Sequence, residues 1–295
     1  MASNIVLGAA NFGLIGTAED AFGAIHCALK RGICAIDVSP SYGGAIAAED
    51  IVGACSSDLS GVKIFSKVLW TDPASVDHRA SILASVEISL KRLRRSRLEI
   101  MFVEAVPDQE WAEVAWNTLA SLVTDGTIGK LGVFYHDELT LPLEVQALFE
   151  IALGEIPIEI SQNLVRRRRI DLAGNNALAY ATAPLAGGLL TGKYSQSRGV
   201  PGRYDFYPDL VNTIDQARAD ILCRALSPLP GGVIGVALAW VLEQPRVCST
   251  ILGVRDKEQL VDCLNRLDQF RNATAEIYEK LEHDIGPQLG LEANT

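Results

Sequence analysis

The sequence predicts a single α/β domain folded as a (β/α)8 TIM barrel, and three observations favour that fold class. Short apolar runs alternate with longer segments of helical pattern along the chain. Eight such units within 295 residues fit one barrel. No GxGxxG motif follows the first apolar run, which disfavours an open dinucleotide-binding sheet.

The predicted strands are apolar throughout rather than alternating, as expected of parallel strands that are buried on both faces. They cover residues 5–8, 35–38, 63–68, 99–103, 130–134, 158–161, 178–183 and 249–253.

Helical segments are predicted between these strands. Thr17 followed by Asp20 is a capping-box pattern, and it predicts a helix that runs to about Lys30. A long loop is expected at 194–212, where Gly, Pro and Tyr are frequent. Further helices are expected near 46–55, 77–94, 109–125, 140–153 and 171–176. One domain would then span 1–295, with its core at about 4–270 and a helical tail at 271–295.

Composition narrows the class of protein. Apolar residues make up 48% of the chain, enough for a large core, and the net charge of −10 disfavours binding to nucleic acid or anionic membrane. No apolar run reaches the roughly 20 residues of a membrane helix, and no secretory signal pattern is present. The six cysteines are scattered without a CxxC pair, and the four histidines show no metal-binding spacing. We therefore expect a cytoplasmic protein that acts on a small molecule, while its oligomeric state stays open.

Four polar residues stand at the C-terminal ends of consecutive predicted strands. Asp37 ends the second strand, Tyr42 lies five residues further on, Lys67 is near the end of the third, and Glu104 follows the fourth. In a barrel these ends meet at one mouth. A tyrosine hydroxyl has a pKa of about 10, so a nearby cation such as Lys67, held by Asp37, would make it a better proton donor. This arrangement suits proton transfer to a carbonyl oxygen while hydride reaches the carbon.

Longer motifs resemble those of the aldo-keto reductases over about residues 4–270. The matching segments are AIDVSPSYGG with AAEDIVG, SLKRLRRSRLEIMFV, DGTIGKLGV, SQN at 161–163, APLAGGLLTGKY and ALAWVLEQPRVCSTILGVRDKEQL. The resemblance implies a (β/α)8 barrel, NADP(H) as cofactor with NAD(H) as the alternative, and reversible carbonyl reduction. By motif, Asp37, Tyr42, Lys67 and Glu104 occupy the family's Asp-Tyr-Lys-His tetrad, with Tyr42 as general acid.

Glu104 departs from that tetrad, because the family has a histidine that donates a hydrogen bond to the substrate carbonyl. A carboxyl group donates only when it is protonated, which burial would favour. In this family a glutamate here is associated with steroid double-bond reduction, so reduction of an activated C=C is one alternative. The other is that Glu104 is an ionised partner of Lys67.

The resemblance also implies a set of cofactor contacts. Arg255 is the candidate for the 2′-phosphate, since a guanidinium can bind it bidentately. The implied contacts are Gln162 at the nicotinamide amide, Leu185 and Gly187 in the APLAGGLL segment, and Gly253, Arg255 and Gln259 around the adenosine phosphate.

Other positions around the cofactor differ from the family. Phe134 and Tyr135 replace a Ser-Asn pair, Thr182 replaces a tyrosine that stacks on the nicotinamide, and Cys263 replaces an asparagine. The adenosine end therefore matches better than the nicotinamide end. This leaves a second hypothesis open: a barrel with an altered role, either a nucleotide-sensing regulatory subunit or a redox-neutral lyase or isomerase.

A run of four arginines, 166–169, follows the sixth predicted strand. It favours either an anionic substrate or a solvated loop with internal ion pairs.

Overall fold

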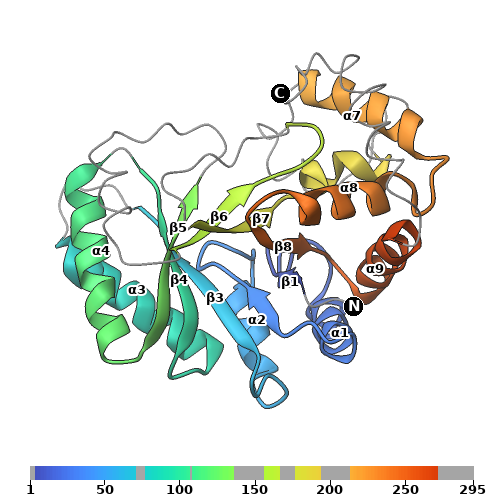
Figure 1. Ribbon diagram of the computed structural model, residues 1–295. Coiled ribbons are helices and arrows are strands. Elements are labelled where there is room, and N and C mark those ends of the chain that lie inside the picture. The colour runs from blue at the N-terminus through green and yellow to red at the C-terminus, as the bar shows by residue number, and fades with distance from the viewer. Residues whose placement is uncertain are drawn as a thin grey trace.

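The computed structural model describes residues 4–70, 77–106, 108–135, 156–166, 177–193 and 213–271. Its eight strands are parallel and form a closed barrel in sequence order. Figure 1 shows the helices on the outside of these strands. The predicted fold class, a single-domain (β/α)8 barrel, is confirmed.

The strands lie where the apolar runs predict them, with ends that differ by no more than two residues. Register between β1 and β8 runs from Ile5↔Thr250 to Gly8↔Gly253, and this pairing closes the barrel. The strands are β1 (Ile5–Gly8), β2 (Ala35–Asp37), β3 (Lys63–Val68), β4 (Leu98–Glu104), β5 (Ile128–Tyr135), β6 (Ile156–Ser161), β7 (Ala177–Thr182) and β8 (Val247–Gly253).

Helix starts follow local capping chemistry. The predicted capping box is present: Asp20 N–H donates to Thr17 Oγ1 at 3.2 Å, and Thr17 N–H donates to Asp20 Oδ2 at 2.9 Å. The described helices are α1 (Ala18–Lys30), α2 (Ala48–Ala54), α3 (His78–Leu93), α4 (Gln109–Thr124), the 3-10 helix η1 (Ala186–Thr191), α7 (Thr213–Leu226), α8 (Gly232–Glu243) and α9 (Lys257–Arg271).

The structure adds three α-helices, α7 to α9, and the 3-10 helix η1, none of which the helical pattern predicted. In α8 every residue from Val233 to Val241 is buried, so the helix has no polar face that would reveal its period. The helices predicted near 140–153 and 171–176, the loop 194–212 and the tail beyond 271 lie outside the described residues. No described helix is long and apolar enough to cross a membrane.

The core has two parts, and the smaller one fills the barrel. It consists of inward-facing residues on alternating positions of the strands, and its aromatic rings pack edge to face, with Phe65 and Tyr180 centroids 5.2 Å apart. The members are Val6, Ala35, Phe65, Ile100, Phe102 and Ile251, with Phe134 and Tyr180 packed against them. Side chains two residues beyond these therefore also face inward, closer to the mouth.

Candidate active site

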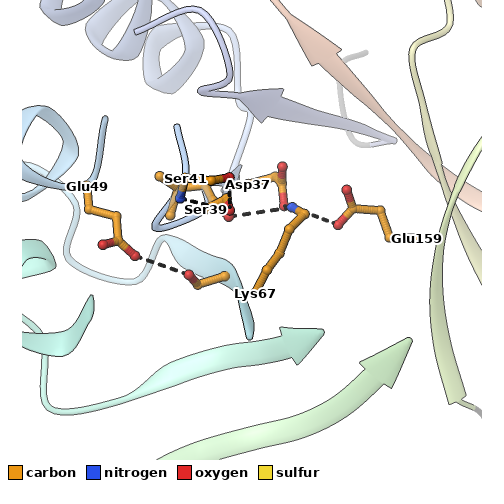
Figure 2. Close-up of polar contacts among 8 residues, drawn as sticks. Asp37, Ser39, Ser41, Glu49, Lys67 and Glu159 are labelled. Carbon is orange, nitrogen blue, oxygen red and sulfur yellow. Dashed lines mark hydrogen bonds and ion pairs between the residues drawn. The ribbon is translucent and has the colours of Figure 1, made fainter. Parts of the chain in front are cut away.

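The centre of the site is a lysine enclosed by two carboxyl groups. Lys67 Nζ lies 2.6 Å from Asp37 Oδ1 and 2.9 Å from Glu159 Oε2. Figure 2 shows the ammonium between the two acids, which come from β2 and β6. All three side chains are at most 2% exposed, so water contributes little to their stabilisation.

Aromatic rings surround the ammonium. Lys67 Nζ lies 5.2 Å from the Tyr42 ring centroid, 5.6 Å from that of Phe134 and 5.9 Å from that of Phe102. These distances permit cation–π attraction, and the apolar rings lower the local dielectric. Charges in this centre therefore interact strongly.

The protonation states follow from burial and proximity. Burial lowers the pKa of Lys67, but the negative charges of Asp37 and Glu159 outweigh it, so the net pKa lies above its ordinary value. Burial raises the pKa of Asp37, and the ammonium opposes that rise. Burial and the charge of Asp37 raise the pKa of Glu159 to about 8, against the attraction of Lys67. Lys67 therefore stays protonated, while Glu159 can titrate close to neutral pH.

A tight loop after β2 positions Tyr42. Tyr42 N–H donates to Ser39 O at 3.0 Å, and Ala48 N–H donates to Tyr42 O at 2.9 Å. Gly43 has a φ of +111°, and a Cβ there would lie 2.4 Å from the Ile46 carbonyl oxygen. The glycine after Tyr42 is thus required for the turn that brings the ring over Lys67.

Glu104 lies at the end of β4 and contacts Trp70, which follows β3. It is two residues beyond Phe102, so it belongs to the inward-facing set at the mouth. Its Oε2 accepts the Trp70 backbone N–H at 2.5 Å, and Asp108 Oδ2 accepts the Trp70 indole N–H at 3.3 Å. In the Trp70 contact Glu104 acts as an acceptor, whereas polarising a substrate carbonyl requires a donor.

The structure brings three of the four predicted catalytic residues together around the ammonium and adds one. Asp37, Tyr42 and Lys67 form the predicted group, and Glu104 lies at the same mouth with Trp70. Glu159 was not predicted from the sequence. A signal existed, because Glu159 is the single charged residue of β6 and stands between two isoleucines, and a buried carboxyl needs a partner.

At the other side of the mouth, the end of β8 and the start of α9 form a cationic corner. Arg255 N–H donates to Gln259 Oε1 at 2.9 Å, and Arg255 Nε donates to Asp256 Oδ2 at 2.8 Å. Asp256 caps α9 by accepting the Gln259 N–H at 2.8 Å. The Arg255 side chain is 45% exposed, and among the described residues a Cβ on the exposed Gly253 would meet only Asn11, at 3.9 Å.

This corner fits a phosphate group. Open space over Gly253, an exposed guanidinium and a helix N-terminus are the features that favour anions. The buried Asn11 Oδ1 beside it has no hydrogen-bond partner among the described residues, so it could accept one from a ligand. The residues present therefore fit the adenosine end of a dinucleotide.

The loop after β7 carries unusual backbone geometry around the two predicted contacts Leu185 and Gly187. Ala183 and Ala186 have φ values of +49° and +50°, and Gly187 and Gly188 have +66° and +104°. Left-handed non-glycine residues are uncommon and are concentrated at functional sites. This geometry is consistent with a binding role for the loop.

The residues that the resemblance implies around the nicotinamide lie at the ends of β5, β6 and β7. Gln162 is buried just beyond β6, and its N–H donates to Thr182 O at 3.0 Å. Phe134 faces into the barrel, whereas Tyr135 packs in the outer core.

Ser161 pairs with Thr182 in strand register. Both residues lie two positions beyond the inward-facing Glu159 and Tyr180. The two hydroxyl groups are thus neighbours facing the mouth.

Two further residues singled out in the sequence are accounted for by packing and pairing. Cys263 is buried in the outer core, and burial raises the pKa of its thiol to about 12. Arg166 forms an ion pair with Asp215, Nη2 to Oδ2 at 2.7 Å. Internal pairing therefore explains Arg166, while 167–169 lie outside the described residues.

Fold and site define a class of protein: a (β/α)8 barrel with a buried lysine, paired with two carboxyl groups, at its mouth. The sequence model of the Aldo/keto reductase family matches residues 4–283, and the chain belongs to that family. It is an NAD(P)H-dependent oxidoreductase of the aldo-keto reductase type.

Relatives and a solved structure match over most of the chain. The L-glyceraldehyde 3-phosphate reductase of Escherichia coli (strain K12) is 24% identical over 95% of this chain and 88% of its own. A probable voltage-gated potassium channel subunit beta of Arabidopsis thaliana is 24% identical over 90% of this chain and 88% of its own. The structure of a glycerol dehydrogenase from Gluconobacter oxydans superposes with a TM-score of 0.74 and 25% identity, covering 97% of this chain and 92% of that one.

Proposed function

We propose that this protein reduces the carbonyl group of a small, sugar-like or anionic substrate, with NADP(H) as hydride carrier and Tyr42 as general acid. The observation that carries the proposal is the buried Lys67 ammonium, hydrogen-bonded to Asp37 at 2.6 Å and 5.2 Å from the Tyr42 ring. A cation beside a phenol stabilises the phenolate, so it strengthens the phenol as an acid.

Each residue then has one task. Tyr42 gives its proton to the carbonyl oxygen, and Lys67 stabilises the phenolate that remains. Asp37 holds the ammonium in position. When bound, the cofactor would supply hydride to the carbonyl carbon. Arg255 would hold the adenosine phosphate, with Gly253 leaving room for it and Gln259 supporting the Arg255 backbone. Ser161, Thr182 and Gln162 would bind the nicotinamide amide.

In its contact with the Trp70 N–H, Glu104 Oε2 is an acceptor, so this contact does not polarise a substrate carbonyl. We assign Glu104 to holding Trp70 at the mouth, where the indole is 40% exposed and can line the substrate space. A sugar-like substrate agrees with the names of two relatives, an L-glyceraldehyde 3-phosphate reductase and a glycerol dehydrogenase.

The test is turnover with NADPH and with NADH against L-glyceraldehyde 3-phosphate, glyceraldehyde, dihydroxyacetone and a steroid enone. Tyr42→Phe should lower kcat by about 10²- to 10⁴-fold and leave the Kd for NADPH within about 2-fold, because only proton transfer is lost. Tyr135→Phe is the matched control, since Tyr135 packs in the outer core, and it should keep its activity. Full activity in Tyr42→Phe would reject Tyr42 as the acid.

A second candidate, a nucleotide-sensing barrel, is favoured by one observation: Phe134 faces inward where the family places a polar contact. In that case NADPH would bind tightly and no carbonyl in the panel would oxidise it. Turnover without any nicotinamide would instead favour a lyase or isomerase.

A further inference from the structure

Glu159 has no place in the tetrad, yet it is as buried as the lysine it contacts. It is 1% exposed, projects from β6 and lies between Phe134 and Tyr180 in strand register. Its Oε2 is 2.9 Å from Lys67 Nζ, which makes Glu159 a second counter-ion of the ammonium besides Asp37 (Figure 2).

The protonation state of Glu159 sets the net charge of the cluster formed by Asp37, Lys67 and Glu159. With all three groups ionised, the cluster would carry one negative charge in excess inside an aromatic shell. A buried excess charge is costly, so one carboxyl group takes up a proton over part of the pH range. Asp37 hydrogen-bonds the ammonium, whereas Glu159 Oε2 has no hydrogen bond of good geometry among the described residues. Glu159 is therefore the group that takes the proton.

We propose that Glu159 is a positioning residue of the active centre: by gaining or losing its proton, it sets how strongly the Lys67 ammonium acidifies Tyr42. This inference rests on the proposed role of Tyr42 as general acid. With Glu159 neutral, the cluster has no net charge, and the ammonium that acidifies the Tyr42 hydroxyl has one counter-ion. With Glu159 ionised, a second negative charge offsets the ammonium, and the phenol becomes a weaker acid.

The surroundings contain few other groups that could take over this titration. Burial and the charge of Asp37 raise the pKa of Glu159 to about 8, with Lys67 opposing. Burial and the neighbouring Cys248 keep the pKa of Tyr180 above its ordinary value, so it stays neutral in this range. In the described chain, the titratable groups around Glu159 are Asp37, Tyr42 and Lys67 in the cluster, Tyr180 beside it on β7, and Glu104 at the same mouth.

The first test compares kcat for carbonyl reduction in Glu159→Gln and wild type between pH 7 and pH 9. Below pH 8 the ratio of variant to wild-type kcat should stay constant, because a neutral Glu159 and a glutamine leave the same net charge. The ratio of variant to wild type should then rise by about 3- to 10-fold as wild-type Glu159 ionises. A purely structural role for Glu159 would lower the variant by the same factor at every pH, and a constant ratio overturns the inference.

Glu49→Gln is the matched control. Glu49 is another buried glutamate, but it lies outside the barrel, where it accepts a hydrogen bond from Ser66 at 3.2 Å and pairs with Arg92. Its ratio to wild type should stay constant with pH. A pH-dependent ratio in Glu49→Gln as large as that in Glu159→Gln would overturn the assignment to Glu159.

A second measurement needs neither cofactor nor substrate, so it separates this inference from the proposed function. Ionisation of Tyr42 is followed by tyrosinate absorbance, as the difference between each protein and the same protein carrying Tyr42→Phe. Tyr42 should ionise at lower pH in Glu159→Gln than in wild type. This shift supports the inference even if no carbonyl is turned over, and identical Tyr42 titrations overturn it even if the reductase is active.

Discussion

At the scale of single residues, three carboxyl groups share the mouth of the barrel, and their contacts separate their tasks. Asp37 hydrogen-bonds the ammonium of Lys67, Glu159 pairs with the same ammonium, and Glu104 accepts the backbone N–H of Trp70. Residue type alone does not distinguish these tasks, because the task of each carboxyl group depends on the hydrogen-bond donor or cation nearest to it.

Glu104→Ala tests the task assigned to Glu104. Loss of the contact should release Trp70 from its position at the mouth, so we expect KM to rise by about 10-fold while kcat stays within about 3-fold. Steady-state kinetics with the best substrate of the panel measure both, and Glu87→Ala on the exposed face of α3 serves as control. If kcat instead falls by about 10²-fold or more while KM is unchanged, Glu104 acts on the reacting carbonyl.

At the scale of elements, close backbone approaches fix how helices pack around the barrel. At Gly53 in α2, a Cβ would lie 1.9 Å from the Arg92 carbonyl oxygen at the end of α3. Gly23 in α1 has room, since the nearest atom, Lys257 Cδ, would be 3.7 Å from a Cβ.

These two glycines predict opposite effects of the same substitution. Gly53→Ala should lower the free energy of unfolding by at least about 1–3 kcal/mol, because α2 and α3 must move apart. Gly23→Ala should raise it by about 0.5–1 kcal/mol, because alanine favours the helix and meets no clash. Urea unfolding followed by circular dichroism measures both. A Gly53→Ala protein as stable as wild type would contradict the close packing.

At the scale of the whole molecule, the site depends on barrel closure. Pairing of β1 with β8 places Gly8 opposite Gly253, and the cationic corner at Arg255 follows directly. A dinucleotide that reaches from this corner to Lys67 would contact both ends of the closed sheet, so its binding should stabilise the folded state.

Thermal unfolding tests this arrangement and the cofactor preference together. NADPH should raise the Tm, and Arg255→Gln should remove most of that shift while leaving the smaller shift with NADH unchanged, because only NADPH carries the 2′-phosphate. Arg97→Gln, the same charge change at the opposite end of the barrel before β4, should behave as wild type. Equal losses for NADPH and NADH in Arg255→Gln would place the 2′-phosphate elsewhere.

The sequence was sufficient to predict the strands, but it predicted only part of the candidate site. The apolar runs located all eight strands, since burial on both faces leaves a continuous signal in the sequence. The order Asp37, Tyr42, Lys67 along successive units was sufficient to place them at one mouth. Glu159 was missed because its partner, Lys67, lies three strands away in the barrel, and periodicity carries no information on contacts across it.

The sequence by itself determined the barrel and the group Asp37, Tyr42 and Lys67, because strand burial and strand order fix which ends meet, and its longer motifs determined the family. Only the tertiary structure decided the pairing of each carboxyl group. Glu104 accepts the Trp70 N–H and Glu159 pairs with Lys67, because the closed barrel brings these groups within contact distance. The low dielectric inside the barrel strengthens such contacts.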